Sequence, residues 1–585
     1  MSEQRNLIVF IIFSIAILTV FQFVFRKPQD TTQVAHVQEQ AASAQKPGEA
    51  TGSATTATAK PGETPSNAAV PGVAASGAVL TRAQALAAGP RIRIATRRLS
   101  GSIALTGARI DDLSLPDYRE TVDPKSPAIE LLSPPRSEHP YFAEFGWTPA
   151  ESGAAKVPDD STVWQTDATT LTGERPVTLT WDNGQGLRFV RTIAVDNDYI
   201  FTVGQRVENR GDKPVKLYPY GLVSRYGTPD TLGYTILHEG PVGVLKDKLV
   251  EHSYKDLVSK GAISDDSTGG WVGITDKYWL AALVPDQNAQ VTTSFHHTAG
   301  GPYKDIYQVD YLGEALIVPP GGSAQTSGRL FAGAKEVKLL SHYEDTLGIK
   351  RFDLAIDWGW FWFLTKPIFI AIDFFYALLG NFGLAILLLT LLIKLAFVPL
   401  AHKSYVSMSA MKKLQPEMMK LRERYAEDKQ KLNTEMMALY KQHKVNPAAG
   451  CLPIVLQIPV FFSLYKVLFV TIEMRHAPFY GWIHDLSAQD PTNIFTLFGV
   501  IPWDAPSFLS FGIWPILMGL TMYLQQKLSP QSPDPMQARI FMFMPLFMTY
   551  LLHTFPAGLV IYWTWNNLLS IAQQWFIMKR MGATT

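Results

Sequence analysis

The stretch LAILLLTLLIKLAFVPL, residues 384–400, is apolar apart from Thr390, Lys394 and Pro399. A helix of roughly 20 such residues crosses a hydrocarbon core about 30 Å thick. The whole run covers 381–400, and comparable runs occupy 7–25, 452–473, 508–526, 540–555 and 557–578. The sequence therefore predicts a polytopic α-helical membrane protein with six transmembrane helices.

The first apolar run, from Leu7 to Phe25, is longer than the core of a cleavable signal peptide, which spans roughly 7–15 residues. It ends in Arg26 and Lys27 and has no A-x-A cleavage site. Residues 1–27 are predicted to form an uncleaved signal-anchor helix, with a signal peptide as the alternative. Residues 28–80 have few large apolar side chains to offset their ordering entropy, which predicts a flexible linker.

Residues 81–345 alternate between apolar and polar side chains, as in VTLTWDNGQGLRFVRTIAV, residues 177–195. Many short alternating runs broken by Gly, Asn and Asp predict a large all-β sandwich domain. The Asn183-Gly184 pair predicts a hairpin turn because both residues tolerate positive φ. His296 and His297 are adjacent on a predicted strand and so point to opposite faces, which argues against a shared metal ion.

The composition of the 585-residue chain excludes several classes of protein. The 52 basic and 51 acidic side chains nearly cancel, which argues against a whole-chain DNA binder. The single cysteine, Cys451, excludes a disulfide scaffold and a cysteine-based zinc site. No phosphate loop, dinucleotide fingerprint or H-E-x-x-H motif occurs. Their absence argues against an ATP-driven pump. We predict no catalytic residues, no cofactor and no metal, and the chain is not expected to be an enzyme.

The loops between the apolar runs indicate the topology. Residues 346–380 contain Lys366 and Asp373 among Trp and Phe residues, which favours an interfacial amphipathic helix over a spanning one. Basic residues concentrate in 401–451, whereas 474–507 contains only Arg475 as a full positive charge. Basic loops remain in the cytoplasm, so we expect both termini to be cytoplasmic and the sandwich to lie on the outer side of the membrane.

Lys394 is the most informative residue because it lies inside an apolar run. Its long side chain either snorkels to the inner headgroups or faces a water-filled cavity within the bundle. Polar residues also recur in the other apolar runs. They either bond helix to helix or line one hydrophilic groove with Lys394; the groove candidates are Gln457, Ser463, Gln525 and Asn566.

The basic segment 401–451 has apolar residues at spacings of three and four on both sides of a polar break at 427–430. This pattern predicts a cytoplasmic hairpin of two amphipathic helices. Either its positive charge only keeps the loop in the cytoplasm, or the hairpin docks to anionic lipid or ribosomal RNA by electrostatic attraction. The candidate docking residues are Lys412, Lys413, Arg422 and Arg424.

The C-terminal half resembles the YidC/Oxa/Alb family of membrane protein insertases. The matching segments are LQPEMMKLRERYAEDKQKLNTEMMALYKQHKVNPAAGCLPIVLQIPVFFSLYKVL (414–468), APFYGWIHDLSAQDP (477–491), QQKLSPQSPDPMQARIFMFMP (525–545) and FPAGLVIYWTWNNLLSIAQQ (555–574). The anchor, linker and sandwich also look like the Gram-negative form. That form implies a periplasmic β-supersandwich similar to sugar mutarotases, a fold likeness that does not imply sugar chemistry. Residues 381–585 would then be an insertase core with five transmembrane helices.

The resemblance implies an insertase and chaperone that inserts and folds inner-membrane proteins, alone or with the Sec translocon, without nucleotide hydrolysis. The implied partners are nascent inner-membrane proteins, the Sec translocon, the translating ribosome and the lipid bilayer. The family's groove carries one basic residue, commonly arginine, at the position of Lys394. Its client contacts match Thr390, Tyr562 and Trp563. Lysine keeps the charge but lacks arginine's planar fork, so charge attraction is expected to survive and bidentate binding is in doubt.

Two other functional classes remain open from the residues. A secondary transporter would use Lys394 as its coupling-ion or substrate site and would show inverted repeats, of which we find no convincing instance. A mutarotase-like enzyme on a membrane anchor would cluster carboxylates and histidines in the sandwich, and it would leave five apolar runs without a role.

Overall fold

The computed structural model describes residues 70–72, 77–151, 153–231, 237–443, 445, 452–497, 501, 503, 506, 509–528 and 535–580. The predicted anchor 1–27, most of the linker 28–80 and Cys451 lie outside these residues. The chain divides into two compact units. The β unit contains the residues up to Asp117, Ile129–Gly333 and His342–Ala355, and the helical unit contains Tyr118–Ala128, Ala334–Ser341 and the residues from Ile356 onward.

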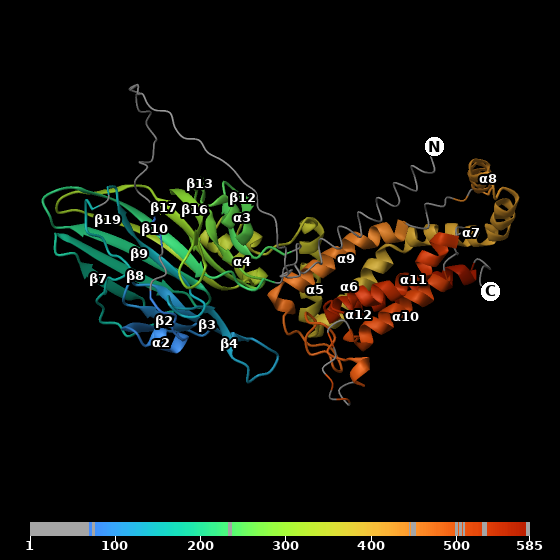
Figure 1. The fold of residues 1–585 in the computed structure, drawn as a ribbon, viewed down its shortest axis with the longest axis horizontal. Coiled ribbons are helices and arrows are strands. Elements are labelled where there is room, and N and C mark those ends of the chain that lie inside the picture. Colours follow the sequence, from blue (N-terminus) through green and yellow to red (C-terminus); the bar gives the residue numbers. More distant parts are fainter. Residues whose placement is uncertain are drawn as a thin grey trace, which may run out of the picture. The chain divides into compact units, whose positions relative to one another are not determined.

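The β unit is built from two sheets, coloured blue to yellow-green in Figure 1. Within the described residues the first sheet has eleven strands, in the order β13 (Ile263–Thr268), β16 (Gln290–Ala299), β17 (Asp305–Gly313), β10 (Val215–Tyr226), β5 (Tyr141–Pro149), β3 (Ile110–Arg119), β2 (Ser100–Ala104), β1 (Arg91–Ala95) and β6 (Thr170–Leu171), with β18 (Leu316–Val318) on β10 and β4 (Ala128–Leu132) on β3. The second has eight, in the order β12 (Lys248–Glu251), β11 (Gly240–Leu245), β14 (Trp271–Thr275), β15 (Trp279–Val284), β19 (Ser323–Ala334), β9 (Ile200–Asn209), β8 (Leu187–Val195) and β7 (Val177–Asp182). The unit also contains the short helices α2 (Arg82–Leu86) and α3 (Tyr254–Lys260), the end of α4 (Val337–Leu347) and η1 (Phe352–Ala355).

The alternation in the sequence places the core between these sheets. On β8 every second residue from Leu187 to Val195 is buried, as period-two patterning requires. Trp271 and Phe331 both pack edge-on against Phe352, with ring centroids 5.6 and 5.2 Å apart, and all three side chains are fully buried. The predicted all-β sandwich is confirmed.

Arg191 occupies a core-facing position of β8, where the pattern alone would place an apolar residue. Its guanidinium is buried and donates to the carbonyl oxygens of Ala108, at 3.1 Å, and Phe145. It also lies 4.7 Å from the centroid of the Trp164 ring. Desolvation by burial lowers the pKa of Arg191 to about 10. Backbone carbonyl oxygens therefore accept hydrogen bonds from an arginine at a position where the alternating pattern predicts an apolar residue.

The hairpin predicted at Asn183-Gly184 joins β7 to β8, which pair antiparallel, and Gly184 has a φ of 70°. On β16, His296 lies 3.3 Å from Asp310, and His297 lies 2.8 Å from Asp305. The two histidines thus pair with different carboxylates. No group of three metal-binding side chains is present in the described part of the chain.

The His296–Asp310 pair predicts a pH-dependent contribution to stability. Its hydrogen bond to Asp310 raises the pKa of His296 above the ordinary value. The stabilisation is therefore fully present below about pH 6.5, the unfolded pKa, and is lost as pH rises through the higher folded pKa. The side chain is 35% exposed, so we expect no more than about 1 kcal/mol. Thermal unfolding of the full chain at pH 5.5 and 8.5 should show a smaller difference in His296→Gln than in wild type.

The helices follow the apolar and amphipathic runs. Their bounds are α4 (Val337–Leu347), η1 (Phe352–Ala355), α5 (Trp362–Leu379), α6 (Phe382–Ala396), α7 (Val398–Arg424), α8 (Lys429–Gln442), α9 (Leu452–Val470), η3 (Ile472–Met474), η4 (Ile494–Thr496), α10 (Ile513–Leu528), α11 (Pro535–Leu552) and α12 (Ala557–Arg580). The helical unit also includes the tip of the β3–β4 hairpin, where the Arg475 guanidinium donates to the Glu120 carbonyl at 3.2 Å.

The run predicted as one span over 381–400 is not a single helix. It breaks at Phe397, and α6 and α7 meet at an angle of 66°. Pro399 lies in the first turn of α7, where its missing N–H costs nothing, but within a continuous helix it would remove a hydrogen bond and clash with the preceding turn. The predicted run is therefore divided between two helices, and its limits as a membrane span stay a prediction.

Among the described helices, α5 alone is long and apolar enough to cross a membrane by itself, and the bent pair α6–α7 meets the same criterion together. Residues Gln457–Val470 and Ala538–Leu552 form shorter apolar helices. The count of six spans thus stays a prediction. The interfacial placement of 346–380 also stays a prediction; the helix within it, α5, leaves Trp362, Phe363 and Phe374 exposed.

Candidate functional site: a polar stripe on α12

Helix α12 is the centre of the helical unit because it packs against α6, α7, α9 and α10. Tyr562, Asn566, Ser570 and Gln574 follow one another at intervals of four residues, which places them along one side of the helix. Their exposed fractions lie between 1% and 8%. We call these four residues the polar stripe. A buried row of polar side chains in an apolar bundle requires partners or water.

Lys394 is directed at the polar stripe. Its Nζ donates to the Ser570 hydroxyl at 2.8 Å, and that hydroxyl donates to the Asn566 carbonyl at 2.8 Å. Lys394 lies in the last turn of α6, where a helix C-terminus favours a positive charge. Its side chain is half-buried. The cation therefore faces α12 and adjoins several buried polar groups.

Helix α9 supplies the other side of the stripe. The Gln457 amide donates to the Tyr562 hydroxyl, so these two predicted residues are in direct contact. Beside them the Phe461 ring packs edge-on against Trp563, with centroids 4.5 Å apart. Trp563 itself is half-buried. The aromatic pair of Phe461 and Trp563 thus lies next to the polar stripe, because Trp563 directly follows Tyr562 in the helix.

Several buried polar atoms of α7, α9 and α12 lack a hydrogen-bond partner among the residues that the structure covers. They are Ser409 Oγ, Ser463 Oγ, Asn566 Oδ1, Gln573 Nε2 and Gln574 Nε2. Each such group costs roughly 1–3 kcal/mol when no water reaches it. Buried water usually satisfies groups of this kind. These polar atoms therefore indicate that water reaches the interior of the helical unit.

A second cation lies inside an apolar helix. Lys466 of α9 donates to Asp357 at 2.7 Å, and the two side chains are 10% and 23% exposed. Gly359 lies against the lysine stem: a Cβ there would approach Lys466 Cε to 2.8 Å, and its φ is 72°. The pair joins the segment before α5 to α9, and α5 itself packs on α9. It is a structural contact between these elements.

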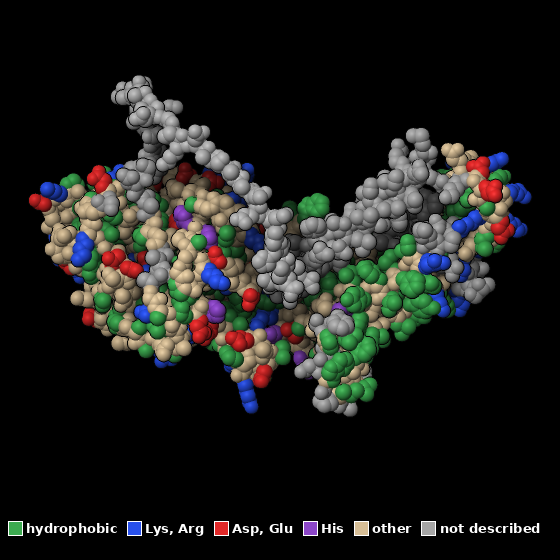
Figure 2. All heavy atoms as spheres, in the orientation of Figure 1, with side chains coloured by type: hydrophobic (Ala, Val, Ile, Leu, Met, Phe, Trp, Pro, Cys, Tyr) green, Lys and Arg blue, Asp and Glu red, His purple; other side chains and the backbone are tan. Residues whose placement is uncertain are grey.

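The predicted hairpin of two amphipathic helices is formed by α7 and α8. Leu414 and Met418 of α7 are buried, and the Tyr440 hydroxyl of α8 contacts Met418 Sδ at 3.9 Å. Charged side chains gather at this end of the unit (Figure 2). Of the docking candidates, Lys413 and Arg424 are exposed and Lys412 and Arg422 are half-buried. The segment 401–451 contains ten basic and five acidic residues.

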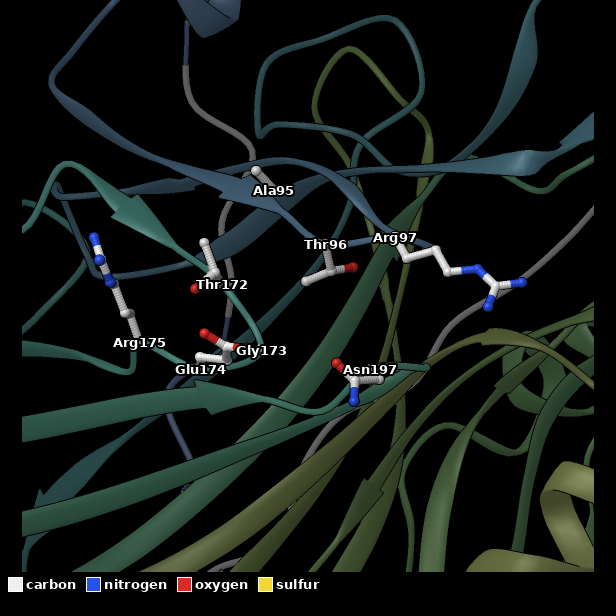
Figure 3. A pocket seen from close by; sticks show the side chains of 8 residues that line it. All are labelled: Ala95, Thr96, Arg97, Thr172, Gly173, Glu174, Arg175 and Asn197. Atoms are coloured by element: carbon white, nitrogen blue, oxygen red, sulfur yellow. The ribbon is translucent and has the colours of Figure 1, made fainter.

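The β unit contains an open pocket of about 410 Å³, lined by Ala95, Thr96, Arg97, Thr172, Gly173, Glu174, Arg175 and Asn197. Its two arginines are exposed, and they point away from each other (Figure 3). Because its charged groups do not converge on one point, the pocket offers no defined ligand position.

Comparison with known proteins adds to this geometry. Residues 91–371 match the family model described as the YidC periplasmic domain, and residues 374–584 match the 60Kd inner membrane protein model. The membrane protein insertase YidC of Methylobacterium nodulans is 57% identical over 86% of this chain and 85% of its own length. That of Methylobacterium radiotolerans is 51% identical over 99% of this chain and 96% of its own. The chain belongs to the YidC family of membrane protein insertases.

Membership of the YidC family makes this an inner-membrane protein with a periplasmic domain, and the domain model locates that domain over the β unit. Insertion of a helix into lipid breaks no covalent bond, so the family's named role is not enzymatic, as predicted. A solved structure titled "Active YidC insertase crystal structure with the first transmembrane domain resolved" is 18% identical and covers 83% of this chain and 92% of that one, with a TM-score of 0.36. The likeness of the β unit to mutarotases stays a prediction.

The structure brings some predicted site residues together and leaves others apart. Lys394, Asn566, Gln457 and Tyr562 meet on or beside the polar stripe. Thr390 is buried, and its hydroxyl donates to Ile386 of the same helix at 2.7 Å. Two further predicted residues, Ser463 and Gln525, lie on α9 and α10, buried and half-buried respectively.

Sequence reasoning missed Ser570 and Lys466. The spacing of four residues from Tyr562 through Asn566 was the signal for Ser570, and it continues to Gln574. For Lys466, a charge within the run 452–473 was the visible signal. Its partner Asp357, 109 positions earlier in the chain, had none.

Proposed function

We propose that this protein inserts and folds inner-membrane proteins through a hydrated groove that contains Lys394 and the polar stripe of α12, without hydrolysing nucleotide. The proposal includes six spans with both termini in the cytoplasm, and an interfacial α5. It also includes cooperation with the Sec translocon for part of the clients. The observation that carries it is the contact of an intramembrane cation with a buried polar row that has unsatisfied atoms.

The energetics require no nucleotide. A client segment of about 20 Leu-like residues gains roughly 0.3–0.6 kcal/mol per residue on entering lipid. The barrier lies in carrying its polar flank past hydrocarbon, which costs several kcal/mol for each unsatisfied group. The hydrated groove, open to the cytoplasmic side, shortens that path, and Lys394 attracts acidic flanks of the client. The apolar segment then leaves past Trp563 into lipid, so the groove lowers the barrier while burial in lipid supplies the driving force.

The basic α7–α8 hairpin is proposed to receive the client. Its excess of positive charge attracts polyanions such as ribosomal RNA or anionic lipid. Lys412, Lys413, Arg422 and Arg424 lie on α7, which is joined to α6 through the bend at Phe397. A client that binds the hairpin is therefore bound to the helix that directly follows α6, the helix of Lys394.

Crosslinking tests the path of the client. A photoreactive residue at Trp563 should form adducts with a ribosome-stalled single-span client, and residues at Thr390 and Tyr562 should do so more weakly because both positions are buried in the resting helices. Leu568 is 43% exposed on the same helix, outside the stripe and the Phe461–Trp563 contact, and serves as the matched control. Equal adducts from Trp563 and Leu568, or adducts from neither, would contradict the proposed path.

A further inference from the structure

The segment that joins α9 to α10 presents large apolar side chains to its surroundings. Tyr480 is 62% exposed, Trp482 38%, Phe495 43% and Leu497 54%. We call these four residues the apolar rim. In Figure 2 the helical unit carries many hydrophobic side chains, and the rim belongs to that unit. Exposed apolar groups on a fixed segment mark a contact surface.

The rim is fixed at one end of the helices. Asp490 is 4% exposed and accepts from the Trp514 backbone N–H at 2.9 Å, which ties the segment to the first turn of α10. The Ala557 N–H donates to the Ala488 carbonyl at 2.6 Å, which ties it to the start of α12. The opposite ends of these helices carry Lys527, Lys579 and Arg580. The apolar and basic ends of the bundle are therefore distinct.

The exposure of the rim is imposed by its backbone and side-chain contacts. Trp482 Nε1 donates to Asp490 at 3.1 Å, and the Phe495 ring lies 6.2 Å from Phe511. Leu497 has a φ of 45°, a left-handed conformation that a branched residue keeps only when its surroundings hold it. These contacts hold Trp482, Phe495 and Leu497 in their exposed positions.

The lengths of the neighbouring helices indicate what the rim contacts. At 1.5 Å per residue, the 16 residues of α10 span about 24 Å and the 18 residues of α11 span about 27 Å. A hydrocarbon core is about 30 Å thick, so the described part of each helix falls a few ångströms short. The basic residues occupy the other end, so the missing apolar length lies at the end where the rim is.

We propose that the apolar rim inserts into the interfacial layer of the periplasmic leaflet and completes the hydrophobic thickness of α10 and α11, with lipid as its partner. Tyrosine and tryptophan prefer this layer because their rings are apolar and their polar atoms remain hydrated. The inference rests on the six-span topology proposed above and extends it to a loop that the topology leaves in water.

Depth-dependent fluorescence quenching tests this inference. In the full-length Cys451→Ala background, a single cysteine replaces Trp482, Phe495 or Leu497 and carries an environment-sensitive fluorophore. The protein is reconstituted into phosphatidylethanolamine–phosphatidylglycerol vesicles that contain spin-labelled lipid. Leu546, 69% exposed on α11, is the matched lipid control, and exposed Asp212 of the β unit is the matched aqueous control.

We expect lipid quenching at the three rim positions to reach at least half of that at Leu546, and to be stronger from shallow than from deep spin labels. Quenching no greater than at Asp212 would overturn the inference. Shielding of the rim in native membranes alone, without quenching in pure lipid, would assign it to a protein partner and would also overturn it. Absence of quenching at Leu546 would instead refute the proposed topology, so the two failures are distinguishable.

Discussion

Replacing Lys394 by Glu is expected to reduce insertion of a single-span client with an acidic flank by at least tenfold, while Lys394→Arg remains within about twofold of wild type. A pair of unit charges 4 Å apart contributes about 4 kcal/mol at an effective dielectric of 20, and a tenfold rate change needs only about 1.4 kcal/mol. Reversing the charge turns attraction of the flank into repulsion beside the polar stripe. The measurement is client insertion in cells depleted of the native protein and supplied with each variant.

The client provides a control that separates charge attraction from misfolding. A client whose acidic flank is changed to a basic one should be inserted better by Lys394→Glu than by wild type, and a misfolded variant cannot produce that reversal. Ser570→Ala removes the hydrogen-bond acceptor of Lys394 but keeps the charge, and should stay within about twofold of wild type. Equal insertion by Lys394→Ala and wild type would reduce Lys394 to an accessory residue.

Breaking the Lys466–Asp357 pair is expected to destabilise the helical unit by about 3 kcal/mol, because the remaining charge is left mostly buried without its partner. Lys466→Met keeps the unbranched shape and most of the length of the side chain, and removes the ammonium group that bonds Asp357. The free energy of unfolding, measured by denaturant titration in mild detergent, should fall in Lys466→Met and to a smaller extent in Asp357→Asn, whose neutral side chain still accepts a hydrogen bond.

A double-mutant cycle isolates this interaction. The Lys466→Met, Asp357→Asn double variant should lose at least about 1 kcal/mol less than the sum of the single variants, because it leaves no isolated charge. Lys338→Met is the matched control, since Lys338 pairs with Asp373 at 2.9 Å but is 77% exposed and should change stability by less than about 1 kcal/mol. Strict additivity in the Lys466–Asp357 cycle would contradict a coupled pair.

Local patterns predicted the parts of the fold that depend on neighbouring residues. The alternation on β8, the hairpin at Asn183-Gly184 and the two helices of the basic segment all appear where period-two or helical spacing placed them. The helix ends were less predictable from hydropathy. The run 381–400 is apolar enough to predict one continuous helix, but Pro399 and the bend at Phe397 divide it, because hydropathy does not register a missing backbone N–H.

The partners of charged residues were the main information absent from the local pattern. Arg191 occupies an apolar register position, and its two terminal nitrogens donate to carbonyls from a different strand and loop. Lys466 bonds a residue 109 positions away. Such pairs depend on how strands and helices pack, and no short-range spacing encodes that arrangement.

The sequence by itself determined the two-part organisation, the sandwich, the basic hairpin and a cation, Lys394, within an apolar run, because each follows from composition or from a period of two or 3.6 residues. The tertiary structure decided that Lys394 turns toward Ser570, that the polar stripe adjoins Gln457, and that Lys466 has a carboxylate partner. Those contacts join residues more than a hundred positions apart, so only the packing of α6 and α9 against α12, and of the segment before α5 against α9, brings the side chains within hydrogen-bonding distance.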